Sequence, residues 1–397
     1  MKSQNRIFKH VTKLKLLLSC TILLLLTDSL YSQPTSILTS KKAIRYNRVE
    51  GLHLGTNIKL FEMNGGKIRT IAFGGYGFSS EELTYGAGIN YNSKKATGYA
   101  GSLNYSHDIS TNDENIMGWL ENSTAAFFAK KDFLDYFLTT GARASILYRI
   151  SRKHEISTKF HSLEYKSISK KDVWSIYELI DSDRKYRDNP AITEKRETRV
   201  TIGYAFDSRI NQFMLTDNFI FNISLEKAGR AFGGYFEYNG LNINLKKYKR
   251  TFGSQMLIVR GFLGVRDRKV SEQFLYYLGG IGTLRGYGHK EFTGNRVGMV
   301  NVDYLFNRAI FKLLPLKFLP YYPTMGLIAF FDAGWTNHGS DPHLTSRSFE
   351  SRDVKINIGV GYSLFRDMIR INFAKRLAKR LDGGDGIKFT LRFFQRI

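Results

Sequence analysis

Hydrophobic and polar residues alternate one by one over most of this chain. At the clearest place, the even positions from Leu52 to Leu60 are mainly apolar, whereas the odd positions carry His53, Asn57 and Lys59. Successive side chains of a β-strand point to opposite faces, so this period of two predicts a strand with one apolar and one polar face. The pattern recurs in later segments, among them 218–226, 241–246, 354–363 and 387–393.

The alternating segments give sixteen predicted strands, an even number, as bacterial outer-membrane barrels require. One of them, 118–129, fits a short amphipathic helix from Met117 to Phe128 equally well. The predicted strands are 46–62, 67–79, 83–92, 97–108, 118–129, 134–150, 154–167, 197–207, 217–228, 233–247, 253–267, 296–306, 323–335, 354–365, 368–377 and 386–395.

The lengths of these segments separate two classes of β-protein. Strands of soluble sandwiches usually have about 5 to 6 residues. Many segments here reach about 10 or more, which is the length that a tilted strand needs to cross a bilayer. The 30 Phe and 23 Tyr residues, with only 6 Pro, also favour strands over helices. The predicted fold is therefore all-β, a transmembrane antiparallel β-barrel.

The first 32 residues have the composition of a signal peptide. Basic residues, the first of them Lys2, precede an apolar run from Leu14 to Leu26 that is too short for a spanning helix. We expect cleavage after Ser32, because Leu30-Tyr31-Ser32 ends the segment with a small residue. The chain would therefore be exported.

The remainder of the chain divides into two parts. We expect a short periplasmic segment at 33–45 and an outer-membrane barrel at 46–397, because about a dozen residues cannot form a folded domain. The only cysteine, Cys20, lies inside the apolar run, which favours a signal-peptide residue over a lipid-attachment site. Disulfides and thiolate metal sites are then excluded from the mature chain.

The formal net charge is +24, and removing the leader with its five Lys/Arg and one Asp leaves +20. In an exported protein this excess favours outer-membrane lipids, including lipopolysaccharide, as partners. The basic residues are spread over alternating strands instead of forming one basic arm, so nucleic acid is not expected. Some of them would line the barrel lumen, namely Lys59, Lys246, Arg370, Lys388 and Arg392.

Connection lengths predict the orientation, because periplasmic turns of such barrels are short and extracellular loops are long. With a periplasmic C-terminus, the turns 151–153, 248–252 and 366–367 are periplasmic. The loops 168–196, 268–295 and 336–353 are then extracellular. The connection 307–322 is long and apolar for the periplasmic side, so we expect it to lie along the membrane interface.

Residues 278–288, Leu-Gly-Gly-Ile-Gly-Thr-Leu-Arg-Gly-Tyr-Gly, come shortly before a predicted strand. Gly279, Gly280 and Gly286 permit tight turns and close backbone approach. The planar guanidinium group of Arg285 stays charged and presents its hydrogen-bond donors in a fixed geometry, and Tyr287 follows two residues later. This combination predicts a long extracellular loop that folds back into a polar cavity, the barrel lumen.

Here the chain resembles the BamA-like outer-membrane assembly superfamily, also called the bacterial surface antigen family. Its hallmark is a Gly-Gly run followed by a tetrad matched by Leu284-Arg285-Gly286-Tyr287. Two further family patterns follow the same order, Tyr-Ala-Phe-Asp-Ser-Arg at 204–209 and Phe-Phe-Asp-Ala-Gly at 330–334. The resemblance covers about residues 45–397. It implies that Arg285 pairs with Asp332, which the alternation independently places on the polar face.

Other chemistry has little support in the sequence. Val259-Arg260-Gly261-Phe262 spells the tetrad but lies inside an alternating run without a preceding glycine pair, so we interpret it as strand. His154-Glu155 does not begin a His-Glu-x-x-His helix, and no serine lies in Gly-x-Ser-x-Gly. We therefore expect no catalytic residues, no metal ligands, no cofactor and no enzyme activity.

The resemblance implies a part in the insertion or translocation of outer-membrane or surface proteins, which would be the clients. Assembly members of the family carry periplasmic POTRA domains before the barrel. We expect none here, so a separate periplasmic or lipoprotein partner would recognise the client. The strands 46–62 and 386–395 would close the barrel, and a weak seam there could template a client strand. An anion-preferring channel and a structural barrel that anchors a partner enzyme stay open as alternatives.

Overall fold

The computed structural model describes residues 42–114, 116–209, 217–253, 255–306, 326–339, 353–364, 369–377 and 386–393. All of these residues belong to one unit of the chain, Lys41–Ile397. The predicted signal peptide 1–32, the segment 33–41, the apolar connection 307–322 and the turn 366–367 lie outside the described residues.

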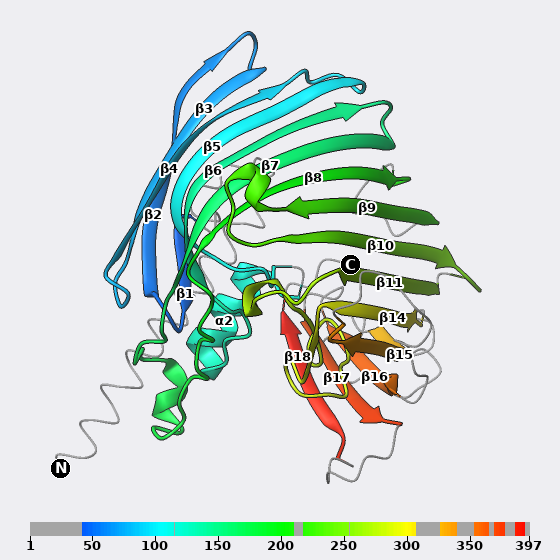
Figure 1. The fold of residues 1–397 in the computed structure, drawn as a ribbon. Coiled ribbons are helices and arrows are strands. Elements are labelled where there is room, and N and C mark those ends of the chain that lie inside the picture. Colours follow the sequence, from blue (N-terminus) through cyan, green and yellow to red (C-terminus); the bar gives the residue numbers. More distant parts are fainter. Residues whose placement is uncertain are drawn as a thin grey trace, which may run out of the picture. The chain divides into compact units, whose positions relative to one another are not determined.

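Sixteen strands form a single antiparallel sheet in which neighbours in the sheet follow one another along the chain (Figure 1). Two further short strands, β12 (Tyr276–Leu278) and β13 (Phe292–Gly294), pair only with each other. The sheet strands are β1 (Ile44–Asn47), β2 (Gly51–Met63), β3 (Ile68–Gly77), β4 (Glu82–Asn92), β5 (Gly98–Ser110), β6 (Phe137–Arg149), β7 (His154–Ser167), β8 (Arg196–Asp207), β9 (Asn218–Ala228), β10 (Tyr238–Arg250), β11 (Met256–Arg266), β14 (Arg296–Leu305), β15 (Gly326–Asn337), β16 (Lys355–Leu364), β17 (Ile369–Arg376) and β18 (Lys388–Phe393).

The register keeps the apolar and polar positions of neighbouring strands on separate faces. Between β9 and β10, Ile223 pairs with Ile243, whereas the next pair along, Asn222 with Asn244, points to the opposite face. A shift of one residue would exchange the two faces, so the alternation in the sequence fixes the register. We call the face with Asn222 and Asp332 the inner face and the opposite one the outer face.

The outer face carries a band of exposed large hydrophobic side chains. Ile146 is 66% exposed and Leu225 is 57% exposed, although both lie in the middle of long strands. Water would strongly disfavour such an extended apolar surface, whereas the hydrocarbon core of a bilayer would cover it. The predicted β-barrel with lipid-facing strands is therefore confirmed.

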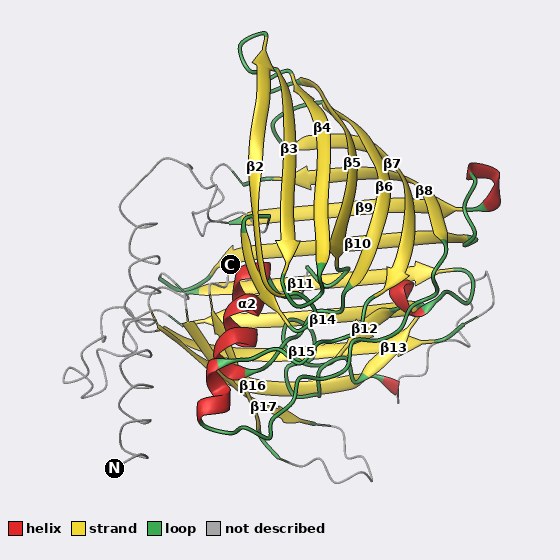
Figure 2. Ribbon diagram, turned by 90° about the vertical axis from the view of Figure 1, so that its left-hand side faces the viewer, coloured by secondary structure: helices red, strands yellow, loops and turns green. Residues whose placement is uncertain are grey.

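The count of sixteen strands is confirmed, but its members differ from the prediction. The segment 118–129 is wrong as a strand and forms helix α2 (Trp119–Ala129), as the helical alternative predicted (Figure 2). Its apolar residues come in adjacent pairs around the polar run 121–124, so the period of two fails there.

The predicted strand 46–62 is also wrong as a single strand, because a turn at 48–50 divides it into β1 and β2. Asn47 Oδ1 accepts hydrogen bonds from the backbone N–H groups of Val49 and Glu50, and Gly51 adopts a φ of 62°. A side chain that bonds to the backbone two residues ahead favours a turn over a continuing strand. Among the described residues, the first strand therefore starts at Ile44, in β1.

The connections alternate between a short-turn end and a long-loop end of the sheet. Turns 64–67, 93–97 and 150–153 join strands at one end, and connections 111–136 and 168–195 join them at the other. Three short 3-10 helices, η1 (Ile176–Leu179), η2 (Arg230–Phe232) and η3 (Glu272–Phe274), lie in long-loop connections. None of the described helices has the length and apolar character to cross a bilayer.

The two faces can be tested with single cysteines, because the only native cysteine is Cys20. Ser145 lies on the inner face of β6, and its hydroxyl contacts that of Ser102 at 2.9 Å, whereas its neighbour Ile146 is exposed on the outer face. In proteoliposomes, Ser145→Cys should react with a charged, water-soluble maleimide, and Ile146→Cys should react only with a lipid-soluble one. Equal labelling of both cysteines by the charged reagent would contradict the assignment of the faces.

Candidate functional site

The segment 278–288 forms a loop that begins on β12 and returns to the sheet through β13. At its base, Lys290 N donates to Gly279 O at 3.1 Å. At its tip, Gly280 N donates to Leu284 O at 2.9 Å, and Tyr287 N donates to the same oxygen at 3.0 Å. The loop thus carries its own backbone hydrogen bonds and presents residues 284–287 as one rigid unit.

Glycine is needed at particular positions of this loop. Gly279 and Gly280 have φ values of 113° and 84°, which residues with a Cβ rarely adopt. At Gly286 the reason is space, because a Cβ there would lie 2.7 Å from the Cβ of Asn357 on β16. Gly279 and Gly280 are therefore needed for the backbone conformation of the loop, and Gly286 is needed for its close approach to the sheet.

Leu284 anchors the loop through apolar packing. Its side chain is fully buried and packs in a cluster with Leu278 and Tyr287 of the loop and with Val297 and Met299 of β14. Burial of a leucine of this kind contributes about 1.5–3 kcal/mol. The inner face is thus apolar beneath the loop and polar beside it.

Arg285 docks beside this cluster and binds two carboxylates. Its Nε donates to Asp332 Oδ2 at 2.9 Å, and its Nη2 donates to Asp332 Oδ1 at 2.6 Å. Nη2 also donates to Asp303 Oδ1 at 2.6 Å, and the guanidinium lies over the ring of Phe330 at 3.7 Å. A bidentate, charge-assisted pair of this kind has high geometric specificity and is stronger than a neutral hydrogen bond.

Asp332 is completely buried, and several donors satisfy its carboxylate besides the Arg285 side chain. It accepts hydrogen bonds from the backbone N–H of Arg285, from Asn301 Nδ2 of β14 and from Asn357 Nδ2 of β16. An unpaired buried carboxylate would be strongly disfavoured. Residues of three adjacent strands of the sheet thus form a preorganised binding site, the receptor, for the side chain of Arg285.

A second arginine contacts the loop from β17. Arg376 Nε donates to Gly286 O at 3.0 Å, and its guanidinium lies over the ring of Tyr287 at 4.4 Å. The Tyr287 hydroxyl in turn donates to Ile356 O of β16 at 3.2 Å. All four residues of the tetrad 284–287 therefore contact the sheet or its side chains.

The structure brings together the predicted residues Arg285 and Asp332, with Gly279, Gly280, Leu284, Gly286 and Tyr287 around them. Sequence reasoning missed Asp303, Asn301 and Asn357. A signal for them exists, since each is a polar residue on the polar side of the alternation in its strand. What the alternation cannot reveal is which polar inner-face residues lie under the loop.

Two other predicted segments lie on the strands as expected. Val259 to Phe262 is part of β11, so the literal copy of the tetrad is strand. Its Arg260 faces inward and donates to Gly282 O of the loop at 3.2 Å. At the end of β8, the motif at 204–209 forms an ion pair between Arg209 and Asp207 at 2.7 Å. That pair lies at the short-turn end of the wall.

The cations predicted to line the lumen all have the inner-face register, but three of them form ion pairs. Arg370 pairs with Asp303 at 3.1 Å, Arg392 pairs with Glu121 of α2 at 2.9 Å, and Lys59 pairs with Glu62 at 3.1 Å. The others, Lys246 and Lys388, lie on strands distant in the sheet order. These residues do not form one compact anion site.

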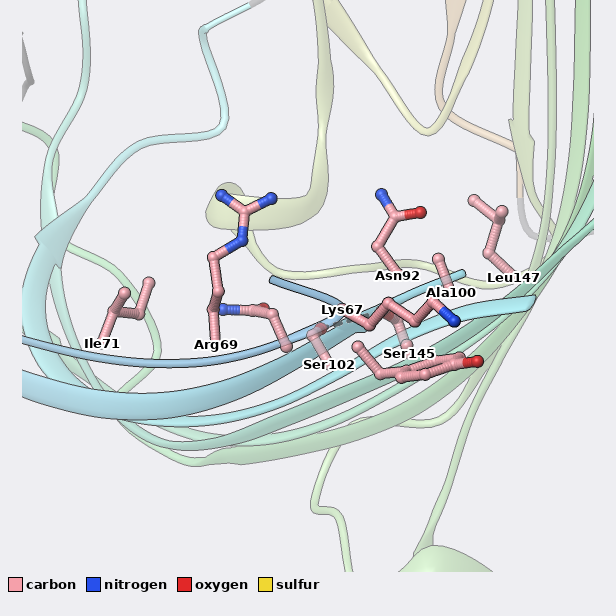
Figure 3. Close-up of a pocket in the computed structure, with 11 residues that line it drawn as sticks. Lys67, Arg69, Ile71, Asn92, Ala100, Ser102, Ser145 and Leu147 are labelled. Carbon is pink, nitrogen blue, oxygen red and sulfur yellow. Dashed lines mark hydrogen bonds between the residues drawn. The ribbon is translucent and has the colours of Figure 1, made fainter. Parts of the chain in front are cut away.

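A separate hollow of about 390 Å³ lies on the inner face of β3 to β6, where Lys67, Arg69 and Asn92 project from the strands (Figure 3). Among the described residues that line it, none is a carboxylate or a histidine. In the described ranges, no cluster of three or more His, Cys, Asp or Glu residues could hold a metal ion. The hollow is therefore a surface with two basic residues and apolar walls, which include Ile71 and Leu147, and its lining holds no acid–base pair.

Residues 64–394 match the model of the Omp85 superfamily domain. The chain belongs to the Omp85 superfamily. It is a bacterial outer-membrane protein, and the resemblance noted in the tetrad is confirmed. Among curated protein sequences, none matches this Omp85 chain.

A solved BamA structure supports the fold of this Omp85 chain, and two CdiB structures resemble it less closely. The crystal structure of BamA from Haemophilus ducreyi lacking POTRA domains 1–3 has a TM-score of 0.54 at 13% identity, over 88% of this chain and 68% of that one. CdiB from Acinetobacter baumannii has a TM-score of 0.48 at 11% identity, over 88% and 58%. CdiB from Escherichia coli has a TM-score of 0.46 at 13% identity, over 88% and 60%.

Removing Arg285 should release the loop. Arg285→Ala leaves the buried carboxylates of Asp332 and Asp303 without their main counter-charge, which costs about 3–5 kcal/mol in comparable pairs. Amide hydrogen exchange in residues 279–291 should therefore accelerate by about 100-fold or more. Mass spectrometry of the exchanged peptides in detergent micelles measures this effect.

Arg268→Ala is the matched control. Arg268 lies in the same connection, but its side chain is 59% exposed and pairs with the exposed Glu237 at 3.3 Å. Such exposed pairs contribute about 0–1 kcal/mol. Equal exchange in the two variants would contradict a docking role for Arg285.

The loop should also respond to pH through His289. Burial, followed by the charges of Arg187 and Lys290, lowers the pKa of His289 to about 3. The undocked loop has an ordinary histidine pKa of about 6.5, so it binds protons more readily, and docking weakens as the pH falls below that value. At pH 5.5 the loop should therefore open about tenfold more often than at pH 7.5.

His289→Phe tests this prediction, because it keeps a ring against Phe133, whose centroid lies 5.4 Å from that of His289. Hydrogen-exchange protection of the loop in wild type should fall about tenfold more than in the variant between pH 7.5 and pH 5.5. If both proteins lose protection equally, other groups cause the pH dependence.

Proposed function

We propose that this Omp85 chain takes part in the insertion or translocation of outer-membrane or surface proteins. The observation that carries the proposal is the seam of the sheet. The strand order begins at β1 and ends at β18, and no ladder joins these two strands in the part of the chain that the structure describes. Edge strands with unpaired backbone groups readily bind another strand.

The lengths of the two edge strands support a seam that opens easily. β1 has 4 residues and β18 has 6 described residues, whereas β10 on the opposite part of the sheet has 13. Each ladder hydrogen bond contributes about 0.5–1.5 kcal/mol, so a short seam is weaker than the long ladders elsewhere in the wall. A client strand could therefore pair with β1 or β18 without breaking a long ladder.

The docked loop supports the same proposal by stiffening the strands next to the seam. Arg285, Arg376 and their partners connect the loop to β14, β15, β16 and β17. A seam can open without unravelling the wall only when the strands behind it are held together. In this proposal the loop holds the last part of the sheet as one body while β18 moves.

We expect the clients to be outer-membrane proteins and the surrounding partners to be outer-membrane lipids, including lipopolysaccharide. A separate periplasmic or lipoprotein partner would gather the client. The orientation that suits such a partner places the short-turn end of the sheet, with Lys67 and Arg69, on the periplasmic side.

Locking the seam should stop insertion. Ile44→Cys with Leu391→Cys places two thiols on outer-face positions of β1 and β18 that are each 37% exposed, and a bifunctional maleimide can join them. Outer-membrane vesicles that carry this variant retain any partner. Insertion of a radiolabelled, unfolded eight-stranded barrel should fall several-fold after cross-linking, as measured by its heat-dependent gel shift.

The matched control joins strands that are already paired. Ile202→Cys with Leu225→Cys uses directly opposed outer-face residues of β8 and β9, so its cross-link should leave insertion unchanged. A locked seam with normal insertion would contradict the proposal. A large anion-selective current that is the same in wild type and Arg285→Ala would favour the channel alternative, for which the inward register of Lys59, Lys246 and Lys388 is the supporting observation.

A further inference from the structure

Helix α2 bonds to both edges of the seam, although it belongs to the connection between β5 and β6. Glu121 and Ser123 lie in its first turn and a half, and both side chains accept hydrogen bonds from the backbone of edge strands. Figure 1 shows α2 as a single helix beside β1 and β18, the first and last strands of the sheet. A helix thus occupies the place where a barrel wall would have a strand ladder.

On the β18 side, Glu121 binds both a side chain and the backbone. Phe393 N donates to Glu121 Oε1 at 3.0 Å. Arg392 donates to the same carboxylate through Nε at 3.0 Å and through Nη2 at 2.9 Å. Glu121 is buried, so this three-donor contact is shielded from water.

On the β1 side, the contact is a neutral hydrogen bond with aromatic packing. Tyr46 N donates to the Ser123 hydroxyl at 3.1 Å, and the ring of Tyr46 packs edge-on against Phe127 at 5.1 Å. In β1, Arg45 and Asn47 lie opposite His53 and Gly51 of β2. The N–H of Tyr46 lies between these pairs and points away from β2, as alternate N–H groups of an edge strand do.

Other residues of α2 fasten the helix to the long-loop end of the sheet. Asn122 Nδ2 donates to Asp132 Oδ1 at 2.9 Å, and Arg48 in the β1–β2 turn pairs with the same carboxylate at 3.1 Å. Tyr186 of the next long connection donates to Ala126 O at 2.7 Å. The helix therefore connects the seam to the long loops on that side of the barrel.

We infer that α2 is a latch that occupies the strand-binding edges of β1 and β18, so that an extended polypeptide strand docks on the seam only when α2 leaves. The Glu121 carboxylate and the Ser123 hydroxyl accept hydrogen bonds from outward-facing N–H groups of β18 and β1. Backbone carbonyls of an incoming strand would accept from the same N–H groups. The inference rests on the proposed function for the identity of the strand as part of a client, but the competition itself does not.

The edges favour an extended peptide over other occupants. Backbone N–H groups of an edge strand are spaced to meet carbonyl oxygens of another strand, and side-chain acceptors can satisfy only some of them. A strand would satisfy the whole edge, whereas the contacts of α2 satisfy one N–H on each side. A strand that accepts hydrogen bonds from N–H groups along the whole edge can therefore displace α2.

A fluorescent peptide with the sequence of residues 386–397 tests the latch on the purified full-length barrel in detergent micelles. This sequence contains β18 and should pair with the free edge of β1. Glu121→Ala with Ser123→Ala should raise its affinity at least tenfold over wild type, measured by fluorescence anisotropy. Glu121→Gln, which keeps one acceptor oxygen but loses the charge, should give an intermediate increase.

Thr124→Ala is the matched control on the same helix, because the Thr124 hydroxyl donates only to Leu120 O of α2, at 2.9 Å. It should bind the peptide as wild type does. A photoreactive group in place of Phe389 of the peptide should cross-link to residues 44–54 in the double variant. Unchanged affinity in the double variant, or cross-links elsewhere, would overturn the inference.

Cross-linking α2 to β1 tests the inference in the opposite direction, because a helix that cannot leave should prevent peptide binding. Tyr46→Cys with Phe127→Cys replaces the two packed rings, and a short bifunctional maleimide then ties α2 to β1. Peptide binding should be lost after cross-linking and restored in the same variant without the reagent. The heat-dependent gel shift confirms that each variant is folded.

Peptide binding and client insertion are separate measurements. If the double variant binds the peptide tightly but client insertion does not depend on the seam, the latch stands and the proposed function fails. If insertion depends on the seam but peptide affinity is the same in all variants, the latch fails and the proposed function stands.

Discussion

The structure depends on the requirement that backbone N–H and C=O groups inside a bilayer find hydrogen-bond partners within the protein. In the wall of this barrel, each strand meets that requirement through its two neighbours, and the outer face is left to lipid. The two edge strands β1 and β18 are the exception among the described residues. Glu121 and Ser123 of α2 accept hydrogen bonds from outward N–H groups there, so a helix supplies part of the hydrogen bonding that a strand ladder would supply.

The same physical device secures the seam and the docked loop. At each place a buried carboxylate binds an arginine and a backbone N–H: Asp332 with Arg285, and Glu121 with Arg392 and Phe393.

The two places also touch. The Ile116 carbonyl accepts from Arg392 Nη2 at 3.3 Å, and Gly282 of the loop lies so close to that carbonyl that a Cβ there would be 2.9 Å from it. Lys290 of the loop pairs with Asp113 before α2 at 2.6 Å. Residues next to and on the latch are therefore in direct contact with the loop.

The expectations from sequence failed where local pattern and tertiary packing disagree. Residues 118–129 contain enough apolar side chains for a strand, but Glu121 and Asn122 are both buried by polar partners, Arg392 of β18 and the nearby Asp132. The predicted strand 46–62 was divided because Asn47 caps a turn in which Arg48 is buried against Asp132. In both places an ion pair between segments far apart in the sequence, Glu121 with Arg392 and Arg48 with Asp132, adds to the local signal, and a window of neighbouring residues does not contain these partners.

The sequence by itself determined the sheet and its faces, because a period of two depends only on neighbouring residues and on the exclusion of polar groups from lipid. It also indicated the loop through the glycines and the arginine, and the family resemblance implied the pairing partner Asp332, which the phase of one strand supported. Only the tertiary structure decided that Asp303, Asn301 and Asn357 complete the receptor for Arg285 and that α2 closes the seam. These contacts join residues 18 to 272 positions apart, and which residues meet depends on how the strands follow one another around the sheet.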